Sequence, residues 1–141
     1  MSDNKFTIFV VEDSDIQRSM MADHLAKYKN VEVVTYSGGD YCLKDLIFEK
    51  VQPPELILMD YFLDSNTVNA KDGLETLAKL KEIAPYTNVI MFTSVENKRI
   101  MELAKQKGAM DYIFKGQDSY EKLDEILARE FSLSENGKAK K

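Results

Sequence analysis

Five short apolar runs, separated by stretches of helical periodicity, constrain the fold of this chain more than any other feature. We expect strands over residues 5–11, 31–36, 55–60, 89–92 and 110–114. Runs that are apolar throughout are typical of parallel strands buried on both faces. Regular alternation of strand and helix with short connections favours right-handed crossovers. The predicted fold class is therefore α/β, with a doubly wound parallel sheet and helices on both faces.

Helical periodicity fills the intervals between these runs. The first helix is expected to begin at Ser14, because Ser14 and Gln17 have the spacing of a capping box. The other helices are predicted over residues 40–50, 72–83, 96–107 and 118–131. On the first two helices, the residues predicted to face the core are Ile16, Met20, Met21, Leu25, Tyr28, Leu43, Leu46 and Ile47.

The length and charge of the chain exclude several classes of protein. A chain of 141 residues has room for one domain, which we place at residues 1–131, followed by a polar, mobile tail at 132–141. The net charge of −5 argues against nucleic acid as a partner. A single cysteine, a polar N-terminus and the lack of a long apolar stretch favour a cytoplasmic protein with no membrane partner.

Polar residues stand at the ends of four of the apolar runs. Glu12 and Asp13 follow the first run, and Asp60 ends the third. Thr93 and Lys115 follow the fourth and the fifth. The carboxyl ends of parallel strands meet at one edge of an open α/β sheet, where ligands bind. Clustered carboxylates beside a hydroxyl and a cation suit Mg²⁺ and a phosphoryl group, with Asp60 as the nucleophile toward phosphorus.

Each of these residues, taken alone, has a more ordinary interpretation. An acidic residue after a strand is commonly a helix cap or a turn residue, and Asp13 has this position before Ser14. A threonine after an apolar run usually packs in the core, and a single lysine is usually a solvated surface charge. The functional interpretation depends on their shared position at the same end of four different strands.

Five motifs extend this pattern over residues 5–131. They are FVVEDSD around Asp13, LILMD ending in Asp60, DGLE at residues 72–75, VIMFTS around Thr93, and GAMDYIFK ending in Lys115. With these motifs the chain resembles the receiver domains of response regulators, of the chemotaxis-regulator type. The resemblance implies a flavodoxin-like fold with five helices around five parallel strands in the order 2-1-3-4-5.

The resemblance also implies a role for each matching residue of the site. Asp60 would accept a phosphoryl group, and Lys115 would contact that group. Asp13, Asp60 and the backbone carbonyl of Phe62 would hold Mg²⁺, with Glu12 in a supporting role. The protein would then be a phosphoacceptor switch that catalyses only its own phosphorylation and dephosphorylation, and no other enzyme activity is expected.

The resemblance further implies a switch and a set of partners. Thr93 would move toward the phosphoryl group, and Tyr112 would exchange between exposed and buried rotamers. The phosphoryl group would come from a histidine kinase or a phosphotransfer protein. The fourth helix, fifth strand and fifth helix would then signal to a downstream protein. We expect a stand-alone receiver that is a monomer or a weak, phosphorylation-dependent dimer.

Three departures from the family pattern affect the surroundings of the site. The polar segment 64–71 makes the loop after Asp60 longer than usual. Gly116 follows Lys115 where the family has a proline in a cis peptide, and a cis bond before a non-proline residue costs about 3–4 kcal/mol. We therefore expect a trans bond or unusual strain there. Phe62 and Val95 offer no group to orient water, so slow self-dephosphorylation is predicted.

Two alternatives to a phosphorylated receiver remain. One is a pseudo-receiver or pure interaction module, in which the acidic pocket binds metal without phosphorylation; the intact Asp60, Thr93 and Lys115 argue against it. The other is a haloacid-dehalogenase-type phosphatase that uses Asp13 and Asp15, which leaves Asp60 unexplained.

Two further residues have side chains capable of chemistry. His24 has no second histidine or cysteine close to it in the sequence, so it is expected at the surface. Cys42 precedes an apolar helix face and is expected to pack in or beside the core.

Overall fold

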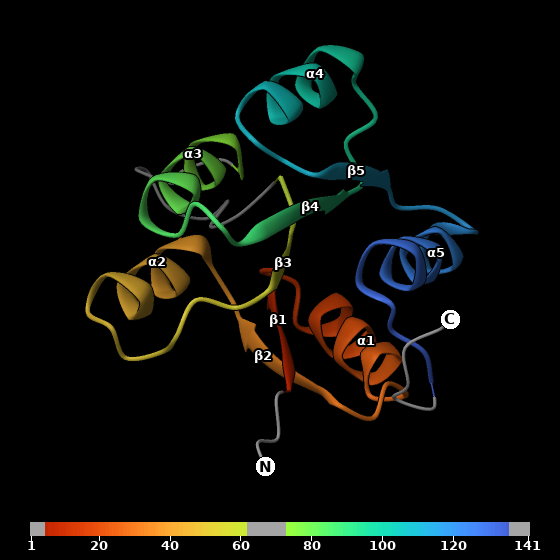
Figure 1. Ribbon diagram of the computed structural model, residues 1–141. Coiled ribbons are helices and arrows are strands. Elements are labelled where there is room, and N and C mark those ends of the chain that lie inside the picture. Colours follow the sequence, from red (N-terminus) through yellow and green to blue (C-terminus); the bar gives the residue numbers. More distant parts are fainter. Residues whose placement is uncertain (1–4, 62–72, 136–141) are drawn as a thin grey trace.

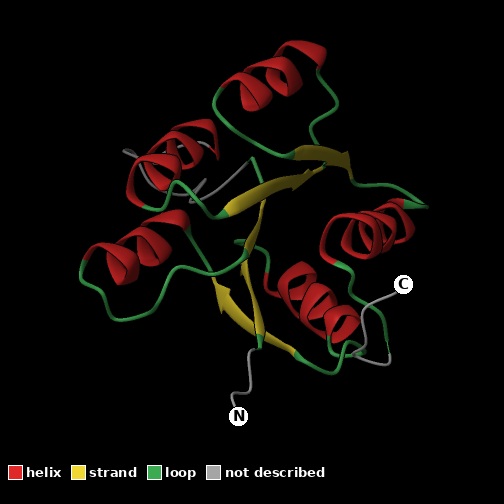
Figure 2. Cartoon of the chain, viewed as in Figure 1, coloured by secondary structure: helices red, strands yellow, loops and turns green. Residues whose placement is uncertain are grey.

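The computed structural model describes residues 5–61 and 73–135, which form ten regular elements (Figures 1 and 2). The strands are β1 (Phe6–Val11), β2 (Val31–Tyr36), β3 (Leu56–Met59), β4 (Asn88–Thr93) and β5 (Asp111–Phe114). The helices are α1 (Asp15–Leu25), α2 (Gly39–Ile47), α3 (Gly73–Ile83), α4 (Lys98–Gln106) and α5 (Ser119–Phe131). The elements alternate along the chain as the apolar runs predicted.

The five strands form one sheet in the order β2-β1-β3-β4-β5, and every pair is parallel. This order and the α/β fold class are those expected from the sequence. Val11 of β1 pairs with Met59 of β3, so the residues that follow these two strands emerge side by side. The fold thereby places the carboxyl ends of the first and third apolar runs next to each other.

Helices cover both faces of the sheet, and each face has its own hydrophobic core. On one face, α2, α3 and α4 pack over side chains that include Phe9, Ile57 and Met91. On the other face, α1 and α5 pack over Ile8, Leu58, Ile90, Phe92 and Ile113. Figure 1 shows these two groups of helices on opposite sides of the strands. Neighbouring residues in a strand point to opposite faces, so the doubly buried strands must be apolar at almost every position.

Three residues predicted to face the core are exposed, two of them in α1 and one in α2. Met21 and Leu25 are buried as expected, but Ile16 is 73% exposed and Met20 is 51% exposed. An α-helix turns by about 100° per residue, so Ile16 and Met20 lie on a stripe well away from the inward face of Met21 and Leu25. Ile47 was also predicted to face the core and is exposed at the end of α2.

The structure also corrects the position expected for His24. This residue is half-buried, and its Nε2 donates to Asp124 Oδ1 of α5 at 2.8 Å. Lys27 Nζ donates to Asp124 Oδ2 at 2.7 Å, and the Tyr28 hydroxyl donates to Oδ1 at 2.6 Å. One carboxylate of α5 thus accepts three hydrogen bonds from α1 and from the turn that follows it. Asp124 lies a hundred residues along the chain, so local sequence contains no sign of it.

Cys42 is fully buried in the α2 side of the core, as expected. Burial raises the pKa of its thiol to about 12, with a smaller contribution from the charge of Asp45. The thiol is therefore protonated at neutral pH and packs as a small apolar side chain. Within the described residues, no helix combines the length and apolar character needed to cross a bilayer.

The carboxylate of Asp124 gives the fold a predicted sensitivity to acid. Burial raises its pKa, but the hydrogen bonds from Lys27, Tyr28 and His24 outweigh burial and lower the pKa below its ordinary value of 3.8. Because the pKa is lower in the folded state, ionised Asp124 stabilises the fold at pH values above the ordinary pKa. This stabilisation is lost as the pH falls through the folded-state pKa. We expect Asp124→Asn to lower the free energy of unfolding by about 1–3 kcal/mol at neutral pH.

Urea unfolding of Asp124→Asn and wild type, at neutral pH and at progressively lower pH, measures this difference. The gap between the two proteins should narrow on acidification. Asp23→Asn, which changes an exposed carboxylate of α1, is the matched control. An equal loss in both variants, or a gap that is independent of pH, would contradict the prediction.

Candidate functional site

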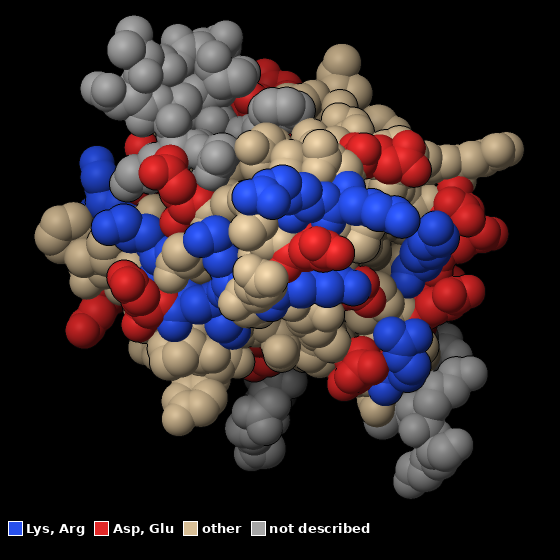
Figure 3. All heavy atoms as spheres, turned by 90° about the horizontal axis from the view of Figure 1, so that it is seen from above, with Lys and Arg blue, Asp and Glu red and all other residues tan. Residues whose placement is uncertain are grey.

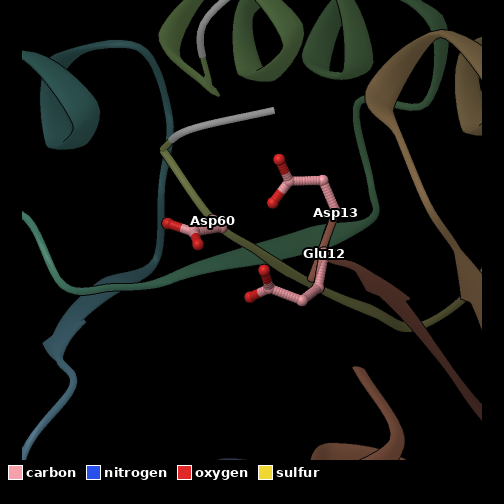
Figure 4. Close-up of side chains that lie close together, drawn as sticks. All are labelled: Glu12, Asp13 and Asp60. Carbon is pink, nitrogen blue, oxygen red and sulfur yellow. The ribbon is translucent and has the colours of Figure 1, made fainter. Parts of the chain in front are cut away.

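Three carboxylates converge at the carboxyl ends of β1 and β3. Glu12 and Asp13 follow β1, Asp60 follows β3, and one oxygen from each lies within 4.8 Å of the others. Figure 4 shows the three side chains directed toward one another from the two strand ends. The side-by-side pairing of β1 and β3 explains this arrangement, because it brings residues 48 positions apart to neighbouring strand ends.

Lys115 enters the cluster from the end of β5. Its Nζ donates to Glu12 Oε1 at 2.8 Å, to Asp60 Oδ2 at 3.1 Å, and to Gln17 Oε1. The backbone N–H of Lys115 donates to the carbonyl of Thr93 at 2.7 Å, which continues the pairing of β4 and β5 beyond the strands. The ammonium therefore connects the acidic ends of β1 and β3 to the edge strand β5.

Burial makes the charges of this cluster interact strongly. Glu12 and Asp60 are each 6% exposed. Burial raises the pKa of Glu12, and the nearby charge of Asp60 raises it further, against the opposing effect of Lys115. Burial alone would lower the pKa of Lys115, but the hydrogen bond to Glu12 and the charges of Asp60 and Glu12 raise it. Lys115 therefore remains a cation that partly neutralises buried carboxylates.

Backbone groups hold the carboxylates in place. The Tyr61 N–H donates to Asp60 Oδ1 at 2.6 Å, and the Ser14 N–H donates to Glu12 Oε2 at 3.1 Å. The start of α3 presses against the same point, because a Cβ at Gly73 would lie only 2.6 Å from the carbonyl oxygen of Asp60. Glycine at the DGLE motif therefore permits the close approach that fixes the end of β3.

Thr93 and Tyr112 lie on the neighbouring strands, next to this cluster. Thr93 ends β4 and is fully buried, and its Oγ1 accepts a hydrogen bond from the Val95 N–H at 3.3 Å. Tyr112 of β5 is 9% exposed, and its hydroxyl donates to the Val95 carbonyl at 2.5 Å. Val95 thus connects the threonine and the tyrosine through its own backbone.

The structure leaves some sequence expectations untested and settles others. Phe62 and the segment 64–71 lie outside the described residues. No cis peptide bond occurs among the described residues, so the bond between Lys115 and Gly116 is trans, one of the two outcomes expected. Asp15 pairs with Arg18 at 2.5 Å with its side chain 88% exposed, and it is not part of the carboxylate cluster.

Sequence reasoning missed the contact between Gln17 and Lys115. The expected helix cap is present, since Ser14 Oγ accepts from the Gln17 N–H at 3.2 Å, but the Gln17 side chain turns to the lysine. The only sign in the sequence is that Gln17 lies in the first turn after an acidic strand end. Its partner is 98 residues away, so the contact needs the fold.

The response regulator receiver domain model matches residues 8–128. The chain belongs to the response regulator receiver domain family. Receiver domains of this family are phosphoacceptor switches that bind Mg²⁺ at an acidic pocket, accept phosphate from histidine kinases and signal to downstream effectors. The acidic cluster of Glu12, Asp13 and Asp60 lies where such a pocket is expected.

Curated relatives share this domain in proteins of different length. The chain is 26% identical to the probable C4-dicarboxylate response regulator DctR of Bacillus subtilis, over 82% of this chain and 48% of the relative. It is 30% identical to a protein-glutamate methylesterase/protein-glutamine glutaminase of Photorhabdus laumondii, over 81% and 31%. The chain thus spans less than half the length of these relatives. It is also 25% identical to the chemotaxis protein CheY of Halobacterium salinarum, over 77% and 82%.

Solved structures share the fold at lower sequence identity. The phosphorylated cyanobacterial phytochrome response regulator RcpA aligns with a TM-score of 0.77 at 23% identity, over 92% of this chain and 96% of that one. A CheY-like receiver domain protein from Methanospirillum hungatei aligns with a TM-score of 0.75 at 21% identity, over 89% and 94%. These likenesses confirm the flavodoxin-like receiver fold.

The raised pKa of Glu12 predicts how metal affinity depends on pH. A proton on Glu12 competes with a divalent cation, and the raised pKa makes this competition begin above the ordinary glutamate value of 4.5. We expect Mg²⁺ affinity to fall on acidification through this range, and Glu12→Gln to remove that part of the pH dependence. Isothermal titration calorimetry with Mg²⁺ over a pH series measures this dependence in wild type and in Glu12→Gln. A profile with the same shape in wild type and Glu12→Gln would contradict this assignment.

Proposed function

We propose that Asp60 accepts a phosphoryl group from a phosphohistidine of a partner protein, in a reaction that depends on Mg²⁺. The observation that carries this proposal is the position of the Lys115 ammonium, 3.1 Å from Asp60 Oδ2 and beside a buried acidic cluster. Lys115 supplies a fixed positive charge next to the attacking carboxylate, where phosphoryl oxygens need neutralisation.

The acidic cluster fits a hard divalent cation. Its donors are all carboxylate oxygens, and Glu12, Asp13 and Asp60 converge within 4.8 Å. Oxygen ligands of this type suit Mg²⁺, which retains several waters. The ion would neutralise negative charge on the carboxylates and on the phosphoryl oxygens. We assign Asp13 and Asp60 as its ligands, with Glu12 in support and the Phe62 carbonyl as a further ligand.

Besides Mg²⁺ and the phosphohistidine of the partner, the proposed transfer would use the side chains of Asp60 and Lys115 and the backbone N–H of Tyr61. An oxygen of Asp60 forms the new bond to phosphorus while the bond from phosphorus to the donor's imidazole nitrogen breaks. The electron pair of that bond remains on the imidazole. The N–H of Tyr61 holds the other oxygen of Asp60 at 2.6 Å, so the carboxylate keeps one orientation. Lys115 then donates to a phosphoryl oxygen in place of Asp60 Oδ2.

We propose that Thr93 and Tyr112 transmit this event to the face formed by α4, β5 and α5. Tyr112 donates to the carbonyl of Val95, and Val95 lies in the segment that connects β4 to α4. A shift of Thr93 toward the phosphoryl group would break its contact with the Val95 N–H and move this segment. In α4 only Ala104 is fully buried, while Ile100, Met101 and Leu103 are partly buried against the core, so a displacement of the helix would shift these side chains.

The α4 part of this face carries a group of cationic side chains that a downstream protein partner would meet. Figure 3 shows Lys and Arg side chains gathered across the face that α4 presents. The exposed cationic residues of α4 and its C-terminal cap are Lys98, Arg99, Lys105 and Lys107. Because the chain as a whole is acidic, this patch gives a partner an oriented electrostatic contact.

Intact-mass analysis with acetyl phosphate, with and without Mg²⁺, tests the proposed acceptor. We expect one phosphoryl adduct on the wild type that depends on Mg²⁺ and is absent from Asp60→Asn. Asp15→Asn is the matched control, because Asp15 is exposed and paired with Arg18 outside the cluster. An adduct that persists in Asp60→Asn would assign the chemistry to another residue. No adduct, together with no response to beryllofluoride, would favour a pseudo-receiver.

Removing the Tyr112 hydroxyl should separate phosphorylation from signalling. Tyr112→Phe keeps the buried ring and loses the hydrogen bond to the Val95 carbonyl, so we expect phosphorylation by acetyl phosphate within about twofold of wild type. Amide chemical-shift changes in α4 on addition of beryllofluoride should become smaller than in wild type. Unchanged shifts in α4 would show that this hydrogen bond has no part in the switch.

A further inference from the structure

Gln17 makes a contact that the receiver chemistry described above does not use. A capping box would direct its side chain to the Ser14 N–H, but that N–H donates to Glu12 Oε2 instead. The Gln17 side chain is thereby free of the helix end, and its Oε1 accepts from Lys115 Nζ. An ammonium has only donors, so the amide must present its oxygen to the lysine.

The Lys115 ammonium has three N–H groups and three side-chain acceptors. Glu12 Oε1 and Asp60 Oδ2 accept from it at 2.8 and 3.1 Å, and Gln17 provides the third acceptor. Two of these acceptors belong to the carboxylate cluster that suits a metal ion. Gln17 alone is neutral and stands outside that cluster. It is the acceptor for which a metal ion would not compete.

The Lys115 side chain is only 17% exposed, but it lines a cavity. A cavity of about 360 Å³ between α1 and α5 is lined by both Lys115 and Gln17, with Phe92 and Tyr120 on its apolar side. The ammonium lies over the Phe92 ring, 6.0 Å from its centre, at the outer limit of a cation–π contact. A flexible four-carbon stem beside open space takes its position from the hydrogen bonds at its end.

We propose that Gln17 is a positioning residue that holds the Lys115 ammonium in line with Asp60 when the carboxylates bind Mg²⁺. This inference rests on the proposed function. With Glu12 engaged at the metal site, Gln17 would still keep one N–H of the lysine occupied on the α1 side. Another N–H would then be held toward an oxygen of the phosphoryl group on Asp60. The side chain acts through Lys115 and needs no contact with the phosphoryl group.

Gln17→Met tests this inference, because methionine keeps the length and helix preference of glutamine without an acceptor of comparable strength. We expect the rate of phosphorylation by acetyl phosphate to fall by about threefold to tenfold. The beryllofluoride concentration needed for half-saturation should rise by a similar factor. The Mg²⁺ affinity and the unfolding midpoint should remain those of wild type. Ser19→Ala, at an exposed position of the same helix, is the matched control. It should change neither the phosphorylation rate nor the response to beryllofluoride.

A second measurement asks whether Gln17 acts through the lysine. In a Lys115→Met background, Gln17→Met should cause no further loss of phosphorylation rate. Intact-mass analysis over long incubations measures this rate. If the two losses multiply in full, Gln17 acts independently and the proposal is wrong. Equal shifts in Mg²⁺ and beryllofluoride affinity in the single variant would also overturn it, since they indicate a general disturbance of the site.

The outcomes separate this inference from the proposed function. A wild-type protein that forms an adduct on Asp60, with Gln17→Met indistinguishable from it, removes the positioning role alone. A wild-type protein that forms no adduct and does not respond to beryllofluoride removes the proposed function, and the role of Gln17 with it.

Discussion

The site depends on one interaction, the contact of the Lys115 ammonium with the buried carboxylates of Glu12 and Asp60. Buried anions at neighbouring strand ends repel one another and lose hydration, so they need a cation close by. Lys115 meets this need within the chain itself. The same charge is then available where a phosphoryl group would be attached. One side chain therefore partly neutralises the acidic pocket, and the same side chain would serve the proposed phosphoryl chemistry.

The parallel sheet makes this interaction possible. Its order places β3 between β1 and β4, so the ends of strands that are distant in sequence open onto one edge. Two separate cores, with α1 and α5 on one face and α2, α3 and α4 on the other, bury the strands on both faces. The residues of the site consequently follow well-packed strands, while α4 contributes one fully buried residue, Ala104, and three partly buried ones. Deeply buried strands beneath the carboxylates and a less deeply buried helix beside them suit a switch.

Much of the site was predictable, and the errors have physical causes. Glu12, Asp13, Asp60 and Lys115 were found because each follows an apolar run, and the shared edge of the sheet then brings them together. The exposure of Ile16 and Met20 was missed because apolar residues spread over too wide an arc of α1 for all to face the sheet. The contacts of Gln17 and His24 were missed because their partners lie about a hundred residues away.

The sequence by itself determined the elements, the fold class and the set of strand-end residues, because hydrophobic periodicity and capping are local properties of the chain. The tertiary structure alone decided which acceptors Lys115 uses, that Val95 joins Thr93 to Tyr112, and that Asp124 ties α5 to α1. These choices depend on distances between side chains brought together only by packing of the helices on the sheet. No local pattern encodes such distances, since each is set by the whole arrangement of the two cores.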